Sequence, residues 1–174
     1  VVGFTPTGLC VLHMPDLTRR EVFSRKGCGV GAIAVSGDGR VLAVGESGPA
    51  PSIYLYGLPG FEDEGDLQNG AETAFAGLCF SASNCLLASV AGAPDFCLSV
   101  WDWRAGTLLL RGKAYSQEVY GLRFSAFSDD CLMSYGTGHV RFWRISETFT
   151  GLKLKGENGR FGQLELSDVY CGVA

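Results

Sequence analysis

Two histidines, His13 and His139, are the only imidazole side chains in this chain of 174 residues, and they limit the chemistry it could perform. A Ser-His-Asp site places a histidine between a nucleophile and a carboxylate, and a catalytic zinc site commonly uses several histidines. Both histidines fall within predicted strands, where a hydrogen-bonding role at a strand end is the favoured interpretation of His139. The sequence therefore predicts no catalytic residue and no metal ligand.

A glycine-rich segment, Gly27-Cys28-Gly29-Val30-Gly31, superficially resembles a dinucleotide-binding loop. That fingerprint requires a strand before the glycines and a helix after them. Here a strand pattern at 32–35 follows the glycines, no helix pattern is present nearby, and the chain contains no GxxxxGK phosphate loop. We therefore expect no cofactor, and we interpret the glycines as a tight connection between two structural units.

The cysteines carry neither a disulfide framework nor a zinc-finger signature, because their number is odd and no two have CxxC spacing. Most lie within apolar runs, as Cys79 does between Leu78 and Phe80, where a free thiol behaves as a small buried hydrophobe. A reducing, intracellular compartment is the favoured setting. The seven cysteines occupy positions 10, 28, 79, 85, 97, 131 and 171.

Composition and charge exclude several classes of partner. Hydrophobic residues make up 47% of the chain and charged residues 18%, which indicates a folded domain, and 25 glycines indicate frequent sharp turns. The net charge of −4 has no basic stripe, so no nucleic acid partner is expected. No run approaches the roughly 18 apolar residues of a membrane span, so no membrane partner is expected either. The start of the chain lacks an initiator Met and a charged region, and resembles a segment of a longer chain rather than a signal peptide.

Three segments of the chain, 29–61, 74–106 and 118–149, repeat one pattern. Each has an alternating run that ends in serine, then a polar turn and a second run, and then a glycine-rich turn and a third run that ends in an aromatic residue. Equivalent positions recur 42 to 45 residues apart, as the aromatic residues Tyr56, Trp101 and Trp143 do. A period of about 40–45 residues with several short strands is typical of a β-propeller blade.

The predicted fold class is therefore all-β: a partial WD-repeat β-propeller with about three complete four-stranded blades and pieces of two more. Trp101-Asp102 is the dipeptide that names WD repeats, and it occurs once, so the prediction depends mainly on the period. Fourth strands are predicted at 107–111 and 152–155. In the first repeat an acidic stretch occupies that place, so its outer strand is expected to be short or irregular. We interpret this stretch, Glu62, Asp63, Glu64 and Asp66, as a solvated loop, with an acidic docking patch as the alternative.

All 174 residues are expected to form one incomplete propeller domain. An open propeller exposes strand edges that invite aggregation, so further blades are expected, from this protein or from another chain. The predicted divisions are the end of a preceding blade at 1–28, blades at 29–73, 74–117 and 118–158, and the start of a following blade at 159–174.

A rigid scaffold without catalytic chemistry binds partners through its loops and faces. Exposed arginine and aromatic side chains are common anchors of protein interfaces. Arg104, Arg111 and Tyr115 are the candidates for such contacts, with an ordinary surface position as the alternative for each. Asp38, Asp95 and the pair Asp129-Asp130 are predicted to act only in turns, which leaves a hydrolase built on a polar central channel as the disfavoured enzymatic alternative.

Several ordered strings give a more specific indication. They are 114–120 (AYSQEVY), 136–143 (GTGHVRFW), 148–154 (TFTGLKL) and 159–162 (GRFG). In this order they resemble the cilia- and flagella-associated protein 44 family, large WD-repeat proteins of motile cilia, and the resemblance runs from about residue 29 to 170. The sister family, cilia- and flagella-associated protein 43, is the second choice, because 54–61 (YLYGLPGF) is similar to it. The acidic stretch departs from the family pattern.

The resemblance implies a non-enzymatic structural role in the ciliary or flagellar axoneme. The two sister proteins form a tether that links the motor domains of an inner dynein arm to the doublet microtubule. The resemblance therefore implies the sister protein, inner-arm dynein, the doublet microtubule and other axonemal proteins as partners. A generic cytosolic WD-repeat adaptor, for example in trafficking or ubiquitin transfer, is the alternative.

Overall fold

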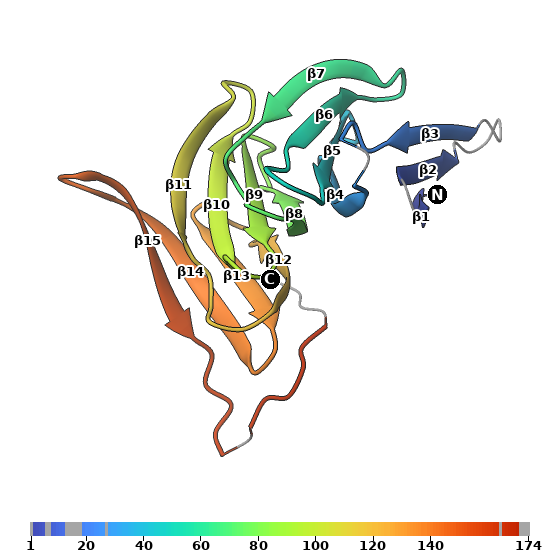
Figure 1. The fold of residues 1–174 in the computed structure, drawn as a ribbon. Helices are drawn as coiled ribbons and strands as arrows, with labels where there is room; N and C mark the ends of the chain where they lie inside the picture. The colour runs from blue at the N-terminus through green and yellow to red at the C-terminus, as the bar shows by residue number, and fades with distance from the viewer. Residues whose placement is uncertain (1, 6–7, 13–18, 27, 164, 171–174) are drawn as a thin grey trace.

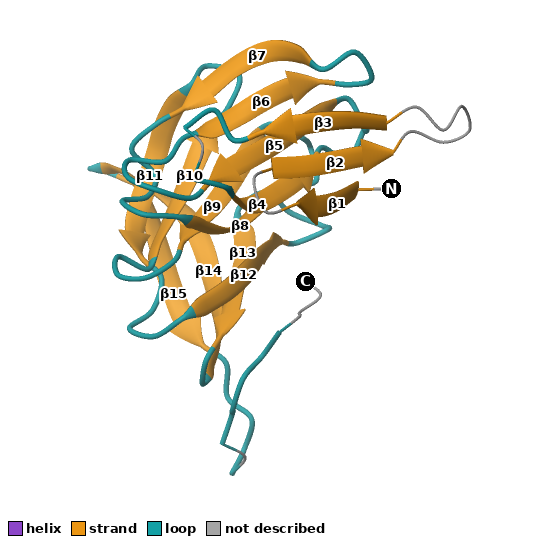
Figure 2. Cartoon of the chain, turned by 45° about the vertical axis from the view of Figure 1, so that its right-hand side comes forward, coloured by secondary structure: helices purple, strands orange, loops and turns teal. Residues whose placement is uncertain are grey.

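The computed structural model describes residues 2–5, 8–12, 19–26, 28–163 and 165–170. All the regular secondary structure of these residues is β, and it forms antiparallel sheets that stand side by side (Figures 1 and 2). In this part of the chain there is no helix long and apolar enough to cross a membrane.

The strands follow one another in chain order within each sheet. The first sheet contains β1 (Val2–Thr5), β2 (Gly8–Leu12) and β3 (Arg19–Phe23). We name the other three sheets blades one, two and three. Blade one contains β4 (Val30–Val35), β5 (Val41–Glu46), β6 (Ile53–Gly57) and β7 (Glu62–Leu67). Blade two contains β8 (Phe75–Phe80), β9 (Leu86–Ala91), β10 (Cys97–Asp102) and β11 (Thr107–Lys113). Blade three contains β12 (Val119–Phe124), β13 (Cys131–Gly136), β14 (His139–Thr148) and β15 (Gly151–Asn158).

The blades are arranged as in a propeller that is not closed. Along the inner side, the first strand of blade two, β8, contacts both β4 and β12, and the fourth strands, β7, β11 and β15, lie on the outer side (Figure 1). This arrangement confirms the predicted all-β fold of four-stranded blades. The exact division of the chain into blades at the predicted boundaries stays a prediction.

The core lies between the blades, because each blade has one apolar face toward each neighbour. In blade two, the cross-strand pair Leu87 and Trp101 packs in the core with blade one, whereas the next pair, Ala88 and Val100, packs in the core with blade three. Successive residues of a strand point to opposite faces of its sheet, so neighbouring pairs of the ladder serve different interfaces. Each fully buried large side chain of this kind contributes about 1.5–3 kcal/mol.

In blades two and three, the aromatic residue that ends the third run of the repeat is a buried tryptophan. The Trp101 indole Nε1–H donates a hydrogen bond to Ser89 Oγ at 3.1 Å, and Trp143 Nε1–H donates to Ser134 Oγ at 3.0 Å. A buried indole N–H needs such an acceptor. Blade one has Tyr56 at this position, which packs in the core toward the first sheet.

The serine that ends the first run of each repeat shapes the turn that follows. Ser36 Oγ accepts a hydrogen bond from the Val41 amide at 2.9 Å, and Ser81 Oγ accepts one from the Leu86 amide at 3.1 Å. Each hydroxyl therefore pairs with the first amide of the next strand. In blade three, Ser125 Oγ instead accepts a hydrogen bond from the Phe127 amide at 3.2 Å, within the turn.

The acidic stretch is a strand, so its prediction as a solvated loop is wrong, whereas the expectation of an irregular outer strand agrees with a bulge in its pairing. Residues Glu62–Leu67 form β7, which pairs with β6 across a bulge beside Gly65, whose φ is 111°. The backbone ladder stabilises the strand. Its four carboxylates are exposed, so none of them has to be buried. Charged side chains on an outer strand also oppose pairing with another edge.

The glycine-rich segment leads into a strand, as its sequence context predicts. Gly29, with φ of 105°, immediately precedes β4. No helix follows, so the segment lacks the structural context of a dinucleotide-binding loop.

Candidate partner-binding surfaces

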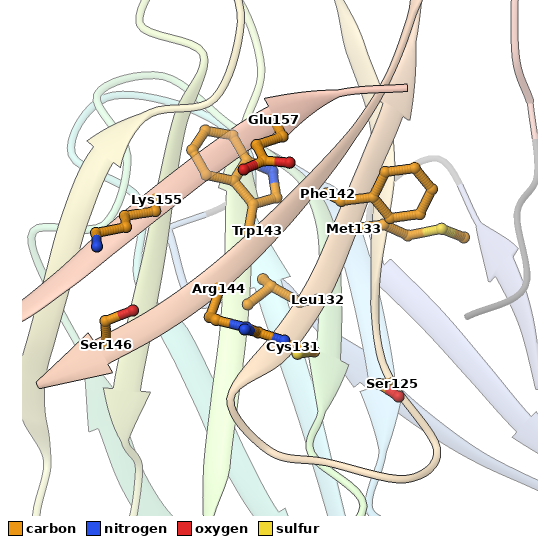
Figure 3. A pocket seen from close by; sticks show the side chains of 10 residues that line it. All are labelled: Ser125, Cys131, Leu132, Met133, Phe142, Trp143, Arg144, Ser146, Lys155 and Glu157. Carbon is orange, nitrogen blue, oxygen red and sulfur yellow. The ribbon is translucent and has the colours of Figure 1, made fainter. Parts of the chain in front are cut away.

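The outward face of blade three, on the side away from blade two, carries a groove of about 650 Å³. Figure 3 shows Met133 and Phe142 lying together in this groove. They form the cross-strand pair that is equivalent to Ala88 and Val100 of blade two. Those two residues are fully buried, whereas Phe142 is 51% exposed. Met133 is itself 4% exposed, so the apolar surface that is open here and buried in the other blades is that of Phe142.

Charged side chains surround this apolar surface. Arg144, Lys155 and Glu157 line the same groove, and Arg144 lies directly opposite Lys155 in the ladder (Figure 3). Interaction with Cys131, and then the charge of Asp130, raises the pKa of Arg144 above its ordinary value. Arg144 therefore stays cationic, and the groove combines an apolar patch with a mainly basic border.

A second groove of about 650 Å³ runs along the inner strands β4, β8 and β12. Its titratable side chains among the described residues are Cys79, Tyr120, Arg123 and Tyr135, without a histidine or carboxylate. Nor do the described residues contain a group of three or more His, Cys, Asp or Glu side chains that could hold a metal ion. His13 lies outside the described residues.

The three predicted contact residues do not form one surface. Arg104 is exposed in the turn between β10 and β11, with its guanidinium 4.5 Å from the centre of the Trp103 ring. Arg111 lies toward the other end of β11 and forms an ion pair of 3.6 Å with Asp95. Tyr115 lies between β11 and β12, where it stacks on a histidine of the next blade.

Two aspartates predicted to act only in turns also connect neighbouring blades, so that prediction is wrong for them. Asp95 accepts a hydrogen bond from the Glu72 amide at 3.1 Å, between blades one and two. Asp129 accepts one from the Ser83 amide at 3.2 Å, between blades two and three. These contacts depend on how the blades are placed, so local turn chemistry did not reveal them.

His139 occupies the strand-end position that the sequence predicts. It is the first residue of β14 and is 2% exposed, with Nδ1 at 3.1 Å from the Thr137 carbonyl oxygen. Its ring stacks on Tyr115 with the centroids 3.8 Å apart, and its Nε2 has no hydrogen-bond partner among the described residues. Burial lowers the pKa of His139, and the positive charge of Arg141 lowers it further.

We expect His139 to make the fold less stable as the pH falls from about 6.5 toward 5. The unfolded chain binds a proton at this residue near its ordinary pKa, whereas the folded chain resists protonation. The unfolded state then holds more protons, so the free energy of unfolding falls, by at most about 1.4 kcal/mol per pH unit for one group. The measurement is the unfolding free energy between pH 5 and 7 for the parent and for His139→Gln.

The His139→Gln variant should show a shallower pH dependence, whatever its stability at pH 7. Asp38, Asp63 and Asp130 provide no competing explanation, because hydrogen bonds lower their pKa values and their contribution is lost only at more acidic pH. Equal slopes for the parent and His139→Gln would contradict the prediction.

Sequence reasoning missed the three phenylalanines that are most exposed in blade three. Phe127 is 94% exposed in the turn between β12 and β13, Phe142 lies in the outward groove, and Phe149 is fully exposed at the tip of the β14–β15 hairpin. The available signal was the TFTGLKL string, which has no counterpart in the other repeats. Exposure of Phe142 has no local signal, because the equivalent positions of the other blades are buried.

Comparison with solved structures defines the class. The β-propeller domain of Cps50 (Swd1) from Myceliophteria thermophila matches with a TM-score of 0.63 and 15% identity, covering 74% of the chain and 38% of that chain. At this identity the likeness concerns the fold alone. With the 42–45-residue period, the blades described above and the Trp101-Asp102 dipeptide, the chain is a WD-repeat β-propeller.

No family model matches the chain, but curated relatives align with most of it. Cilia- and flagella-associated protein 44 of Chlamydomonas reinhardtii is 47% identical over 172 aligned residues, 95% of this chain and 10% of that protein. The Mus musculus protein of the same name is 39% identical over 92% of this chain and 9% of its own length. The Trypanosoma brucei brucei protein of the same name is 41% identical over 81% of this chain and 8% of its own length. The chain belongs to the cilia- and flagella-associated protein 44 family.

Two further relatives are more distant. The sister protein 43 of Xenopus laevis is 34% identical over 52% of the chain and 6% of its own length, so the first choice of family is confirmed over the second. The 77 kDa echinoderm microtubule-associated protein of Strongylocentrotus purpuratus is 32% identical over 59% of the chain and 15% of its own length.

Membership of this family supports a location in the cilium or flagellum and a role as a scaffold there. The family name and the propeller fold point to a structural or adaptor protein rather than an enzyme. The chain spans about a tenth of the length of the curated relatives it matches.

Proposed function

We propose that this chain is part of an axonemal tether that links an inner dynein arm to the doublet microtubule and so regulates ciliary beating. The observation that carries the proposal is the 47% identity to the Chlamydomonas protein over 95% of the chain. The sister protein 43, inner-arm dynein, the doublet microtubule and other axonemal proteins are the proposed partners, without nucleic acid or membrane. The relative named as a microtubule-associated protein supports the microtubule among them.

The fold suits a tether because its contact surfaces are rigidly placed. Strand ladders and interblade cores hold the loops, so a load on one face passes through packed side chains to another. We retain Arg104, Arg111 and Tyr115 as proposed contact residues. Arg104 is the most available of them, because Arg111 pairs with Asp95 and Tyr115 stacks on His139.

Purification of the tagged full-length protein from isolated axonemes tests this proposal. The expected co-purified proteins are the sister protein 43 and an inner-arm dynein heavy chain, and the interaction should survive nuclease and detergent treatment. A tagged protein that stays diffuse in the cytosol and co-purifies with trafficking or ubiquitin-transfer machinery would favour the cytosolic adaptor instead.

We also propose that a following blade covers the inner part of the outward groove of blade three. The Val169 amide donates a hydrogen bond to the Gly136 carbonyl at 3.1 Å, and Thr137 forms an isolated bridge with Asp168. Ser47 and Ala74 form the same bridge at the point where blade two begins. Residues 165–170 therefore lie beside blade three in the same way as the start of blade two lies beside blade one.

This arrangement predicts the effect of a charge at Phe142. In the full-length protein, Phe142→Asp should destabilise blade three by about 3 kcal/mol or more, because a following blade would bury the carboxylate against apolar side chains. Amide hydrogen exchange of β13 and β14 measures the change. Phe127→Asp is the matched control and should leave exchange unchanged, and an equally silent Phe142→Asp would show that the face is open.

A further inference from the structure

The hairpin of β14 and β15 extends well beyond blade three. In blade two the equivalent ladder ends at the pair Asp102 and Thr107, which corresponds to Arg144 and Lys155. Blade three continues for four more pairs to the turn, a length of about 13 Å at the rise of a strand. We name this extension, residues 145–154, the arm. Figure 1 shows its tip projecting away from the other strands.

Burial stops partway along the arm. Ile145 and Leu154, the pair at its base, pack against the core between blades two and three. Leu152 is exposed, and Phe149 at the tip is fully exposed. The base therefore fixes the direction of the arm, while Leu152 is only partly covered and Phe149 has no cover in the described chain.

The tip is an ordered turn rather than a loose loop. Thr148 Oγ1 donates a hydrogen bond to the Gly151 carbonyl at 2.7 Å, and Gly151 has φ of 102°, a conformation that glycine adopts without strain. The turn thus fixes the backbone that carries Phe149 at the tip. A backbone that is already ordered loses less conformational entropy on binding, and exposed aromatic side chains are common interface anchors.

The outward side of the arm, together with the ladder pair that precedes it, is basic. Arg144 lies directly opposite Lys155, and Lys153 occupies the same side two pairs further along. All three side chains are exposed. Two like charges directly across a ladder destabilise each other. Glu157 offsets part of this repulsion at Arg144, and carboxylates brought by a partner would offset more of it. On the arm itself the one carboxylate, Glu147, belongs to the opposite side.

We propose that the arm docks on an acidic surface of a partner protein, with Phe149 in an apolar pocket and Arg144, Lys153 and Lys155 facing carboxylates. The apolar tip supplies the buried contact, and the basic side selects the partner by charge. This inference rests on the proposed axonemal function in one respect: the partner is expected to be an axonemal protein.

Site-specific photo-crosslinking of the full-length protein tests the proposal. Phe149→p-benzoylphenylalanine is expressed in ciliated cells that lack the native protein, and both isolated axonemes and intact cells are irradiated. Phe127→p-benzoylphenylalanine is the matched control, because it is also an exposed phenylalanine of blade three. The crosslinked peptides are then identified by mass spectrometry.

The expected result is one discrete adduct from position 149, on a partner segment with apolar residues flanked by Asp or Glu, and no such adduct from position 127. Lys153→Glu combined with Lys155→Glu should reduce this adduct by about tenfold or more, because like charges would then meet at the contact. Lys113→Glu, an exposed lysine of β11, should not change it.

Three results would overturn the proposal: no adduct at position 149, an adduct within the protein's own chain, or an adduct that is insensitive to charge reversal. Absence of the parent protein from axonemes would instead contradict the proposed function. In that case, the crosslinks formed in the irradiated intact cells still test the arm by the same three criteria.

Discussion

Replacement of Trp101 by alanine should destabilise blades one and two by about 3–5 kcal/mol, the usual cost of removing a buried tryptophan. Trp101 is 1% exposed and belongs to the core between these blades. The variant loses the apolar contacts of the indole, and it leaves Ser89 Oγ without the donor it has at 3.1 Å. Amide hydrogen exchange of β9 and β10 in the full-length protein measures the loss, expected as an acceleration of about a hundredfold or more.

A second variant separates packing from hydrogen bonding. Trp101→Phe keeps most of the apolar volume but lacks the Nε1–H donor, so it should cost about 1–3 kcal/mol. Phe127→Ala is the surface control and should remain within about 0.5 kcal/mol of the parent. Parent-like protection of β9 and β10 in Trp101→Ala would contradict the description of Trp101 as an interblade anchor.

Gly31→Ala should also have a large effect, because it inserts a methyl group where two blades nearly touch. A Cβ at Gly31 would lie 2.2 Å from the Phe75 carbonyl oxygen and 3.0 Å from Ser47 Oγ. Phe75 begins the inner strand of blade two, so its backbone can yield only if the blades separate. We expect a loss of about 3 kcal/mol, the upper part of the range for overpacking.

Gly112→Ala is the matched control for this position. A Cβ there meets nothing within 4 Å, and alanine in a strand is favoured over glycine by about 0.5–1 kcal/mol. Urea unfolding of the two variants and the parent gives the comparison. Similar midpoints for Gly31→Ala and Gly112→Ala would show that the blades are not in the close contact described here.

The fold could be predicted because the residues that recur in each repeat have local physical roles. Serine accepts a hydrogen bond from an amide of the turn or of the next strand, and a large aromatic residue packs between blades, so both residue types recur with the blade period. Strand β7 was not predictable in this way. Its acidic residues oppose strand formation locally, and only pairing with β6 on an outer, solvated edge makes the strand stable.

The candidate surfaces were less accessible to sequence reasoning. Phe142 and Val100 occupy equivalent ladder positions, and only the presence or absence of a neighbouring blade separates an exposed side chain from a buried one. Arg111 was a candidate contact residue, with an ordinary surface position as the alternative, and the turn between β9 and β10 brings Asp95 to it. The residue type at a position is read directly from the sequence. Whether its side chain is exposed depends on how the blades are arranged, which the sequence pattern alone does not give.

Electron tomography of intact axonemes tests the central claim most directly. A cleavable density label fused to the full-length protein is compared with unlabelled axonemes by subtomogram averaging. If the protein is part of the axonemal tether, labelled axonemes should show one added density in each structural repeat of the axoneme. This density should lie between an inner dynein arm and the doublet microtubule. Labelled and unlabelled axonemes that average to the same density, with the label confined to the cytosol, would contradict it.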